Sequence, residues 1–208
     1  MAIKAEKPKK NRNLQKTRAE ILEAAFGEVF TRGFQGVSVD EIVAKTNLTK
    51  GAFYHQFPTK LDLGYALVEE VIQPMTYSRW IEPLKKYENP LQGILDQLKQ
   101  LIGKAHPVHL QYGCPLNNLV QEMAPQDSIF KEKLATALHN WIEGIEKELN
   151  RGKQNGFIRP EVDTRQVAHF VVMAHEGFYG MLKGLNDPKA FQALYNSIEK
   201  YFETIKSI

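Results

Sequence analysis

Cysteine is almost absent from this sequence, because Cys114 is the single one among 208 residues. No disulfide can therefore form within the chain, which suits a reducing cytosol, and we expect a cytoplasmic protein. No apolar run approaches the ~18 residues that a membrane span needs, so no membrane partner is expected. The basic N-terminus is not followed by an apolar stretch, and it is not interpreted as a secretory signal.

Enzyme signatures are also missing. The sequence has no glycine-rich loop of the kind that cradles phosphate, no His-Glu-x-x-His and no Ser/His/Asp spacing typical of a catalytic triad. His175 and Glu176 are adjacent, so on a helix their side chains point to different faces. We therefore do not expect an enzyme. A helical enzyme and an adaptor that does not bind nucleic acid remain the alternative classes.

Positive charge is concentrated at one end of the chain. Residues 1–60 hold 11 basic and 6 acidic side chains, a net charge of +5, whereas residues 61–208 hold 16 and 18, a net charge of −2. A cationic segment on a near-neutral body suggests a polyanionic partner, nucleic acid before membrane. The alternative is a solvated tail that binds nothing.

The apolar spacing predicts an all-α protein of about nine helices, since strand-like alternation is hard to find. Two helix N-termini are expected at capping boxes, where Ser or Thr precedes an acidic residue by three positions: Thr17 with Glu20, and Ser38 with Glu41. A further helix is expected to open at Thr59, with Asp62 in its first turn. Thr49 is expected to cap a third short helix. The helix from Thr59 should stop or kink near Pro74.

The rest of the chain is predicted to form longer helices separated by loops. Their expected ranges are 90–104, from Cys114–Pro115 onward, from Asp127 or Ser128 to about Asn155, 163–183 and 188–205. Asp163 should cap one of them with Gln166 as its partner, and Pro188 should occupy the first position of the last. Residues 105–113 are expected to be a loop.

The segment 38–60, SVDEIVAKTNLTKGAFYHQFPTK, contains two short helices joined by a tight turn after a longer helix, as in a helix-turn-helix. The second short helix would enter the major groove of DNA, and Gly51 would allow it to approach closely. Phe53 and Phe57 are expected to face inward. The candidate DNA-binding residues are Ser38, Thr49, Lys50, Gly51, Ala52, Tyr54, His55 and Lys60.

This N-terminal region resembles the DNA-binding domain of TetR-type transcriptional regulators, chiefly through Thr-Lys-Gly-x-Phe-Tyr-x-x-Phe-x-x-Lys-x-x-Leu. The resemblance covers roughly residues 15–68. It departs from the family pattern at Asn47, where glycine is usual, and at Gln56, where an aromatic residue or histidine is common. It implies a double-stranded DNA partner with a palindromic operator, and a repressor that a small-molecule inducer of unknown identity releases.

The resemblance also implies three regions: a basic flexible tail at 1–14, a helix-turn-helix domain at 15–58, and a ligand-binding and dimerisation domain at 59–208 that begins with a connecting helix at 59–73. The apolar faces expected to pair in a homodimer, or alternatively to pack only within the monomer, contain Phe170, Val171, Phe178, Met181, Phe191, Leu194, Ile198 and Phe202. The candidate ligand-binding residues, which core packing would equally explain, are Cys114, Trp141, Phe170, Met173, His175, Phe178 and Tyr179.

Cys114 supports two interpretations. A helix N-terminus lowers the pKa of a thiol, so Cys114 could be a redox or electrophile switch, and the segment around it is similar to one in a TetR subgroup with cysteine sensors. It could equally be a small buried residue. The spacing of His106, His109 and Cys114 matches no strong zinc template, and neither a metal nor another cofactor is expected.

Overall fold

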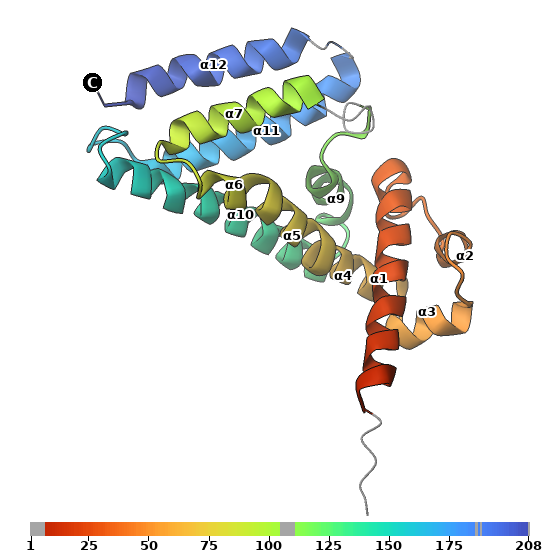
Figure 1. Cartoon of the computed structure of the whole chain (residues 1–208). Coiled ribbons are helices and arrows are strands. Elements are labelled where there is room, and N and C mark those ends of the chain that lie inside the picture. Colours follow the sequence, from red (N-terminus) through yellow and green to blue (C-terminus); the bar gives the residue numbers. More distant parts are fainter. Residues whose placement is uncertain (1–6, 105–110, 186, 188, 208) are drawn as a thin grey trace, which may run out of the picture.

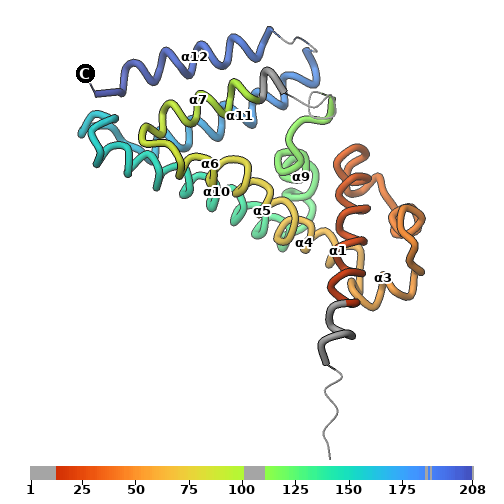
Figure 2. Tube along the Cα trace, in the orientation of Figure 1, coloured from red at the N-terminus to blue at the C-terminus, as the bar shows by residue number. Residues whose placement is uncertain are grey.

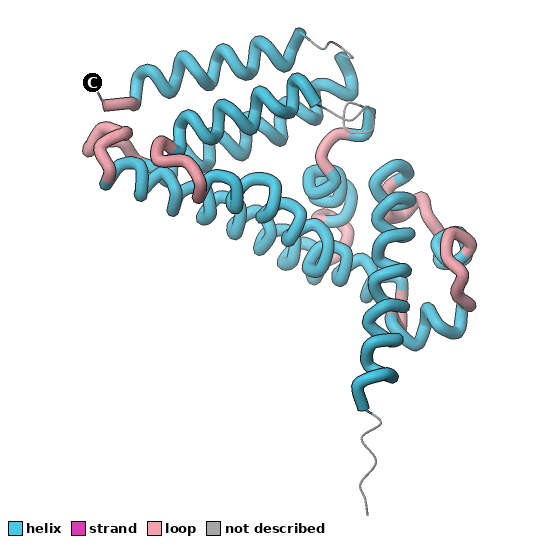
Figure 3. The backbone as a smooth tube through the Cα atoms, viewed as in Figure 1, coloured by secondary structure: helices cyan, strands magenta, loops and turns pink. Residues whose placement is uncertain are grey.

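The computed structural model of the chain describes residues 7–104, 111–185, 187 and 189–207. Its secondary structure over these residues is helical, with one isolated β-bridge between Ile158 and Lys206 (Figure 3). Counting the continuous helical stretch at 60–84 once, the described residues form nine helices, which confirms the all-α prediction.

Three helices form an N-terminal unit, called the head here: α1 (Lys7–Arg32), α2 (Val39–Val43) and α3 (Lys50–Gln56). The buried stripe of α1 includes Ile21, Ala25 and Val29, as the apolar spacing predicted. Gly33 ends α1 with a φ of 79°, a left-handed conformation that glycine adopts without strain. Figure 1 shows α2 and α3 on the side of α1 that faces away from the rest of the chain.

The expected start of α1 at Thr17 is wrong, because the helix already begins at Lys7 and Thr17 lies in its interior. Glu20 therefore forms no capping box, and its carboxylate instead accepts a hydrogen bond from the Asn47 backbone N–H at 3.1 Å. Residues 7–14 of the expected flexible tail belong to this helix, and residues 1–6 lie outside the described part of the chain.

The connecting helix continues well beyond Pro74, so of the two outcomes expected there, a stop or a kink, the stop is wrong. It comprises α4 (Lys60–Ala66), η1 (Leu67–Ile72), α5 (Gln73–Thr76), η2 (Tyr77–Ile81) and α6 (Glu82–Leu84), where η1 and η2 are π-helical. Pro74 and Pro83 each follow a π-helical segment within two residues. A proline ring normally clashes with the carbonyl four residues earlier, and the wider π turn displaces that carbonyl.

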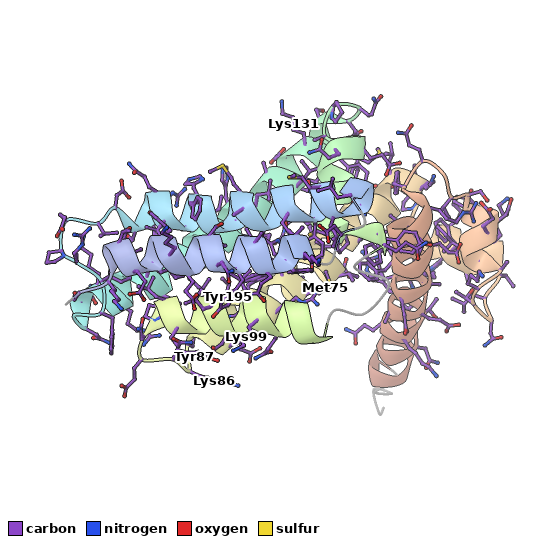
Figure 4. The ribbon with its side chains drawn as sticks, turned by 90° about the horizontal axis from the view of Figure 1, so that it is seen from above. Met75, Lys86, Tyr87, Lys99, Lys131 and Tyr195 are labelled. Atoms are coloured by element: carbon purple, nitrogen blue, oxygen red, sulfur yellow. The ribbon has the colours of Figure 1, made fainter. Side chains whose placement is uncertain are left out.

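Five further helices complete the body: α7 (Pro90–Lys104), α9 (Pro115–Met123), α10 (Ser128–Gln154), α11 (Thr164–Leu185) and α12 (Lys189–Ile205). Helix α12 covers α7 and α11, and seen from above it runs alongside both (Figures 1 and 4). Helix α9 stands between α1 and the body helices (Figure 2). One hydrophobic core runs through head and body.

Several predicted helix starts in the body are confirmed. Cys114 is the residue before α9, and the carboxylate of Asp127 accepts from the Phe130 N–H at the start of α10. The Asp163 carboxylate accepts from the Gln166 N–H at 3.1 Å, as expected. Pro188, expected at the first position of the last helix, lies outside the described residues, as do His106, His109 and most of the expected 105–113 loop.

Candidate DNA-binding surface and ligand cavity

Helix α2 is fixed by a complete capping box. The Ser38 side chain accepts from the Glu41 N–H, and a Glu41 carboxylate oxygen accepts from the Ser38 N–H at 2.7 Å. The other carboxylate oxygen binds Arg32 at 2.7 Å. The Ser38 hydrogen bonds and then Arg32 lower the pKa of Glu41 to about 2. The contribution of this cap to stability is therefore complete above the ordinary glutamate range and is lost as the pH falls toward 2.

Helix α3 is held by its inner face. Phe53 is 0% exposed and Phe57 is 1% exposed, with ring centroids 5.8 Å apart, and the Thr49 side chain caps the helix by accepting from the Ala52 N–H. Phe53 and Phe57 thus face inward as predicted. The opposite face is open, and Thr49, Lys50, Gly51, Tyr54 and His55 are exposed while Ala52 is half-buried.

Lys50 is not a free cation. Its ammonium lies 2.7 Å from one oxygen of Asp40 and 3.0 Å from the other, and this hydrogen-bonded ion pair raises its pKa. The pair links the start of α2 to the start of α3. A phosphate that binds Lys50 must therefore compete with the Asp40 carboxylate. No local signal in the sequence indicates this ion pair.

Lys60 and Gln56 face inward in part. The Lys60 ammonium lies 4.6 Å from the centre of the Phe34 ring and is half-buried, and burial lowers its pKa. Gln56 donates from its side chain to the Leu14 carbonyl at 3.2 Å. Lys60 therefore fits the expected DNA-contacting set less well than the exposed residues of α3.

In the body, four of the seven candidate ligand-binding residues converge. Cys114, Trp141, His175 and Tyr179 line one internal cavity of about 20 Å³, together with Met75, Thr76, Arg79, Trp80, Gly113 and Pro115. The His175 ring meets both tryptophan rings edge-on, 4.8 Å from Trp80 and 5.1 Å from Trp141. The indole N–H of Trp141 is buried and has no hydrogen-bond partner among the described residues. The other three candidates lie elsewhere: Phe170 and Met173 are exposed, and Phe178 packs on Phe191.

A larger groove of about 460 Å³ is also lined by Trp141. Residues of the connecting helix and of α10 form its walls, including Gln73, Tyr77 and Asn140. Trp141 and Thr76 line both spaces. A cavity of 20 Å³ holds about one water molecule. The cavity alone is therefore too small for an organic molecule, whereas the volume of the groove lies in the usual range of ligand sites.

The surroundings of Cys114 argue against a reactive thiol. The side chain is half-buried against the core, and desolvation of the thiol, followed by the nearby Glu176 carboxylate, raises its pKa well above the usual value. The N–H groups of Asn117 and Leu116 at the start of α9 lower the pKa, as expected for a helix N-terminus, but their effect is smaller. The thiol is thus protonated near neutral pH and is a poor nucleophile.

We expect N-ethylmaleimide to modify Cys114 more slowly near neutral pH than it modifies a free cysteine peptide, because little thiolate is present. Cys114→Ser should leave DNA affinity unchanged. Mass spectrometry of a labelling time course and a binding titration of the variant check the two expectations. Labelling as fast as that of the peptide would restore the switch interpretation.

Comparison with known proteins agrees with both halves of this architecture. Residues 21–67 match the model of the family "Bacterial regulatory proteins, tetR family", and residues 90–198, more than half of the chain, match the "Tetracyclin repressor-like, C-terminal domain".

This protein belongs to the TetR family of bacterial transcriptional regulators. It is similar to an uncharacterised helix-turn-helix transcriptional regulator in the lacX 3′ region of Lactococcus lactis subsp. lactis, with 23% identity over 93% of this chain and 96% of the relative. It is also 23% identical to the transcriptional repressor DhaR of Mycobacterium sp. (strain GP1), over 77% of this chain and 79% of DhaR.

Solved structures show the same fold. A TetR-family regulator from Cytophaga hutchinsonii has a TM-score of 0.83 with 21% identity, covering 93% of this chain and 96% of the other. The reduced form of NemR from E. coli has a TM-score of 0.79 with 20% identity, covering 89% and 96%. These relatives are regulators rather than enzymes. No described helix of this TetR-family chain is long and apolar enough to span a membrane.

The expected dimerisation residues of this TetR-family protein divide into two groups. Five of them are buried in the protomer's own core, which favours the alternative that they pack within the monomer: Val171, Phe178, Phe191, Ile198 and Phe202. Leu194 is half-buried, and Phe170 and Met181 are exposed. The periodicity identified apolar positions correctly, but the core rather than a second copy covers most of them.

The solvent face of α11 instead combines large apolar side chains with glycines. Phe170, Met173, Met181 and Leu185 are between 37% and 63% exposed. Gly177, Gly180 and Gly184 are interspersed among them, and a Cβ at any of the three would meet no atom within 4 Å. This face can therefore accept another helix at close range.

Arg18 holds the head to the body, although the sequence alone places it among the free charges of the N-terminal region. Its guanidinium donates to both oxygens of Glu70, at 2.5 to 3.2 Å, and to the Gln56 carbonyl, and it lies 4.3 Å over the Phe57 ring. These contacts attach α1 and α3 to the connecting helix. No local sequence signal marks them, because Arg18 and Glu70 are far apart in the chain.

Proposed function

We propose that this TetR-family regulator is a homodimeric repressor that binds a palindromic operator in the cytosol and releases it when a small molecule enters the body. The observation that carries the proposal is the exposed face of α3 around Gly51, held rigidly by the buried Phe53 and Phe57. A helix with a bare glycine and flanking polar groups fits the major groove. A dimer would present two such helices to two half-sites.

The test is binding to DNA selected by the protein itself. Rounds of selection from a random-sequence pool on the immobilised protein should yield a duplex, called the selected duplex below, that contains an inverted repeat. Fluorescence anisotropy then compares the selected duplex with a scrambled one of the same composition. Failure to enrich any repeated sequence would contradict the proposal.

Asp40→Asn is expected to raise the affinity for the selected duplex by about two- to fivefold, the factor that corresponds to an exposed ion pair. The substitution frees the Lys50 ammonium from its carboxylate partner and removes a negative charge beside the proposed groove-binding helix. Anisotropy titration measures the effect. An unchanged or lower affinity would show that Lys50 does not meet phosphate.

For the dimer, we propose that two copies pair through the solvent face of α11. Large exposed apolar side chains favour burial, and the glycines between them permit close helix approach. A two-fold interface places the same face on both protomers. The residues of this face are Phe170, Met173, Gly177, Gly180, Met181 and Gly184.

Gly177→Glu is expected to convert the dimer into monomers at micromolar concentration, because two carboxylates would be buried at the interface. The protomer should fold normally, since a Cβ at Gly177 meets nothing within 4 Å. Light scattering after size exclusion measures the mass. Gly27→Glu is the matched control, because Gly27 is equally open but lies on α1. A dimeric Gly177→Glu variant would move the interface to another face.

The inducer is proposed to occupy the cavity beside Trp141, opened into the neighbouring groove. Support comes from the aromatic walls formed by Trp80, Trp141 and Tyr179, and from the indole N–H of Trp141, which lacks a partner among the described residues. A ligand that binds only the conformation in which this cavity is open stabilises that conformation. If the DNA-binding heads are displaced in the open conformation, the ligand lowers the affinity for the operator.

A further inference from the structure

The loop between α1 and α2 is tied to the body by a single carboxylate. Beyond Gly33, the backbone N–H groups of Phe34 and Gln35 donate to the two oxygens of Glu122 in α9, at 2.8 and 2.7 Å. Hydrogen bonds to an ionised acceptor are among the strong ones in proteins. Glu122 thus holds the point at which the head's first helix turns toward α2.

The same loop is also packed against two other elements of the body. The Phe34 ring is 3% exposed and meets the Phe130 ring of α10 edge-on, with centroids 5.0 Å apart. A Cβ at Gly64 of α4 would lie 2.4 Å from Phe130 and 2.7 Å from Phe34, so the packing there has no slack. The loop is therefore tightly packed. A displacement of α9 is transmitted to the loop and is not taken up by loose packing around it.

The opposite end of α9 forms part of the internal cavity. Gly113, Cys114 and Pro115 line it, together with Trp141 and His175. Helix α9 has only nine residues, a length of about 13 Å, so its two ends move together as a rigid rod. One end of this rod contacts the cavity, and the other holds the loop that precedes α2.

We propose that Glu122 is the positioning residue that couples the cavity to the DNA-binding head, by tying the α1–α2 loop to α9. This rests on the proposed function above. A ligand that pushes the Cys114 end of α9 pulls the loop through Glu122, and α2 and α3 follow it. The route runs from α9 to the head directly, in addition to the connection through the helix at 60–84.

The coupling can be tested in the reverse direction. If a ligand in the cavity affects the head, DNA bound to the head must also affect the cavity. Cys114 is the single cysteine of the chain and lines the cavity, so its rate of labelling by N-ethylmaleimide, compared between samples at one pH, reports changes in the surroundings of the thiol. Saturating selected duplex should slow labelling of the wild-type protein by about fivefold or more. In Glu122→Ala, labelling should be the same with and without bound duplex.

Gln121→Ala is the matched control, since Gln121 is the exposed neighbour of Glu122 on the same helix. It should behave as the wild type does. Equal protection by DNA in the wild type and in Glu122→Ala would overturn the proposal, and so would an absence of protection in the wild type when anisotropy shows the duplex bound. Glu122→Gln keeps the side-chain shape but can accept only one of the two bonds with its oxygen, and it should lose part of the protection.

A second experiment needs no DNA, so its outcome tests this proposal independently of the proposed function. In the free protein, Glu122→Ala and Glu122→Gln should label faster at Cys114 than the wild type, while Gln121→Ala should not. Thermal denaturation monitors whether each variant is folded. Folded Glu122 variants that label at the wild-type rate would overturn the coupling, whatever the outcome of the DNA selection.

Discussion

Gly51→Leu is expected to reduce the affinity for the selected duplex on the order of a thousandfold, toward the level of non-specific binding. A leucine at this position projects from the exposed face of α3, where the helix is proposed to enter the major groove. The fold should tolerate the change, because a Cβ at Gly51 meets only the Thr49 hydroxyl, at 3.7 Å. Replacing a helical glycine by a better helix former should even stabilise the head by about 0.5–1 kcal/mol.

Gly27→Leu is the matched control for this prediction. A Cβ at Gly27 would likewise meet no atom within 4 Å, but this glycine lies on α1, away from α3. The affinity of the control variant for the selected duplex should stay near that of the wild type. Thermal denaturation should show both variants folded. Tight binding by Gly51→Leu would mean that another surface contacts the DNA.

Phe53→Ala is expected to destabilise the protein by about 3–5 kcal/mol, the range for removing a buried aromatic side chain. Phe53 is 0% exposed and packs against Phe57 and against the edge of Tyr54, so the cavity left behind lies under the whole of α3. Since the total stability of a domain is about 5–15 kcal/mol, a large part of it would be lost. Urea denaturation followed by circular dichroism measures the change.

Tyr54→Ala separates stability from binding. Tyr54 is 45% exposed, so its removal should change the free energy of unfolding by less than about 1 kcal/mol. It should nevertheless weaken DNA binding, because Tyr54 belongs to the proposed contact face.

A Phe53→Ala variant with the wild-type urea midpoint would show that α3 is not supported by this core.

Local signals in the sequence predicted most of the helices. Ser38 with Glu41 forms a capping box as expected, and the helix expected to open at Thr59 does so, with Asp62 completing a capping box. Both features depend only on residues three positions apart. Thr17 with Glu20 has the same spacing, yet helix α1 continues through it. The motif identifies a favourable cap, but the preceding residues decide whether the helix needs one.

Properties that depend on distant residues could not be predicted. Nothing near Glu122 in the sequence indicates that its carboxylate binds the N–H groups of Phe34 and Gln35. The apolar spacing of α11 located Phe178 and Met181 equally well, but only the packed structure shows that Phe178 is buried and Met181 is 63% exposed. The raised pKa of Cys114 likewise comes from burial and from Glu176, which lies on another helix.

Sequence-specific DNA binding through α3 can be tested by the salt dependence of binding. Anisotropy titrations with the selected and the scrambled duplex, at rising salt concentration, separate base recognition from charge attraction, because phosphate contacts weaken steeply with salt. We expect the wild-type protein to retain the selected duplex at a salt concentration that releases the scrambled one. Loss of both duplexes at the same salt concentration would contradict it.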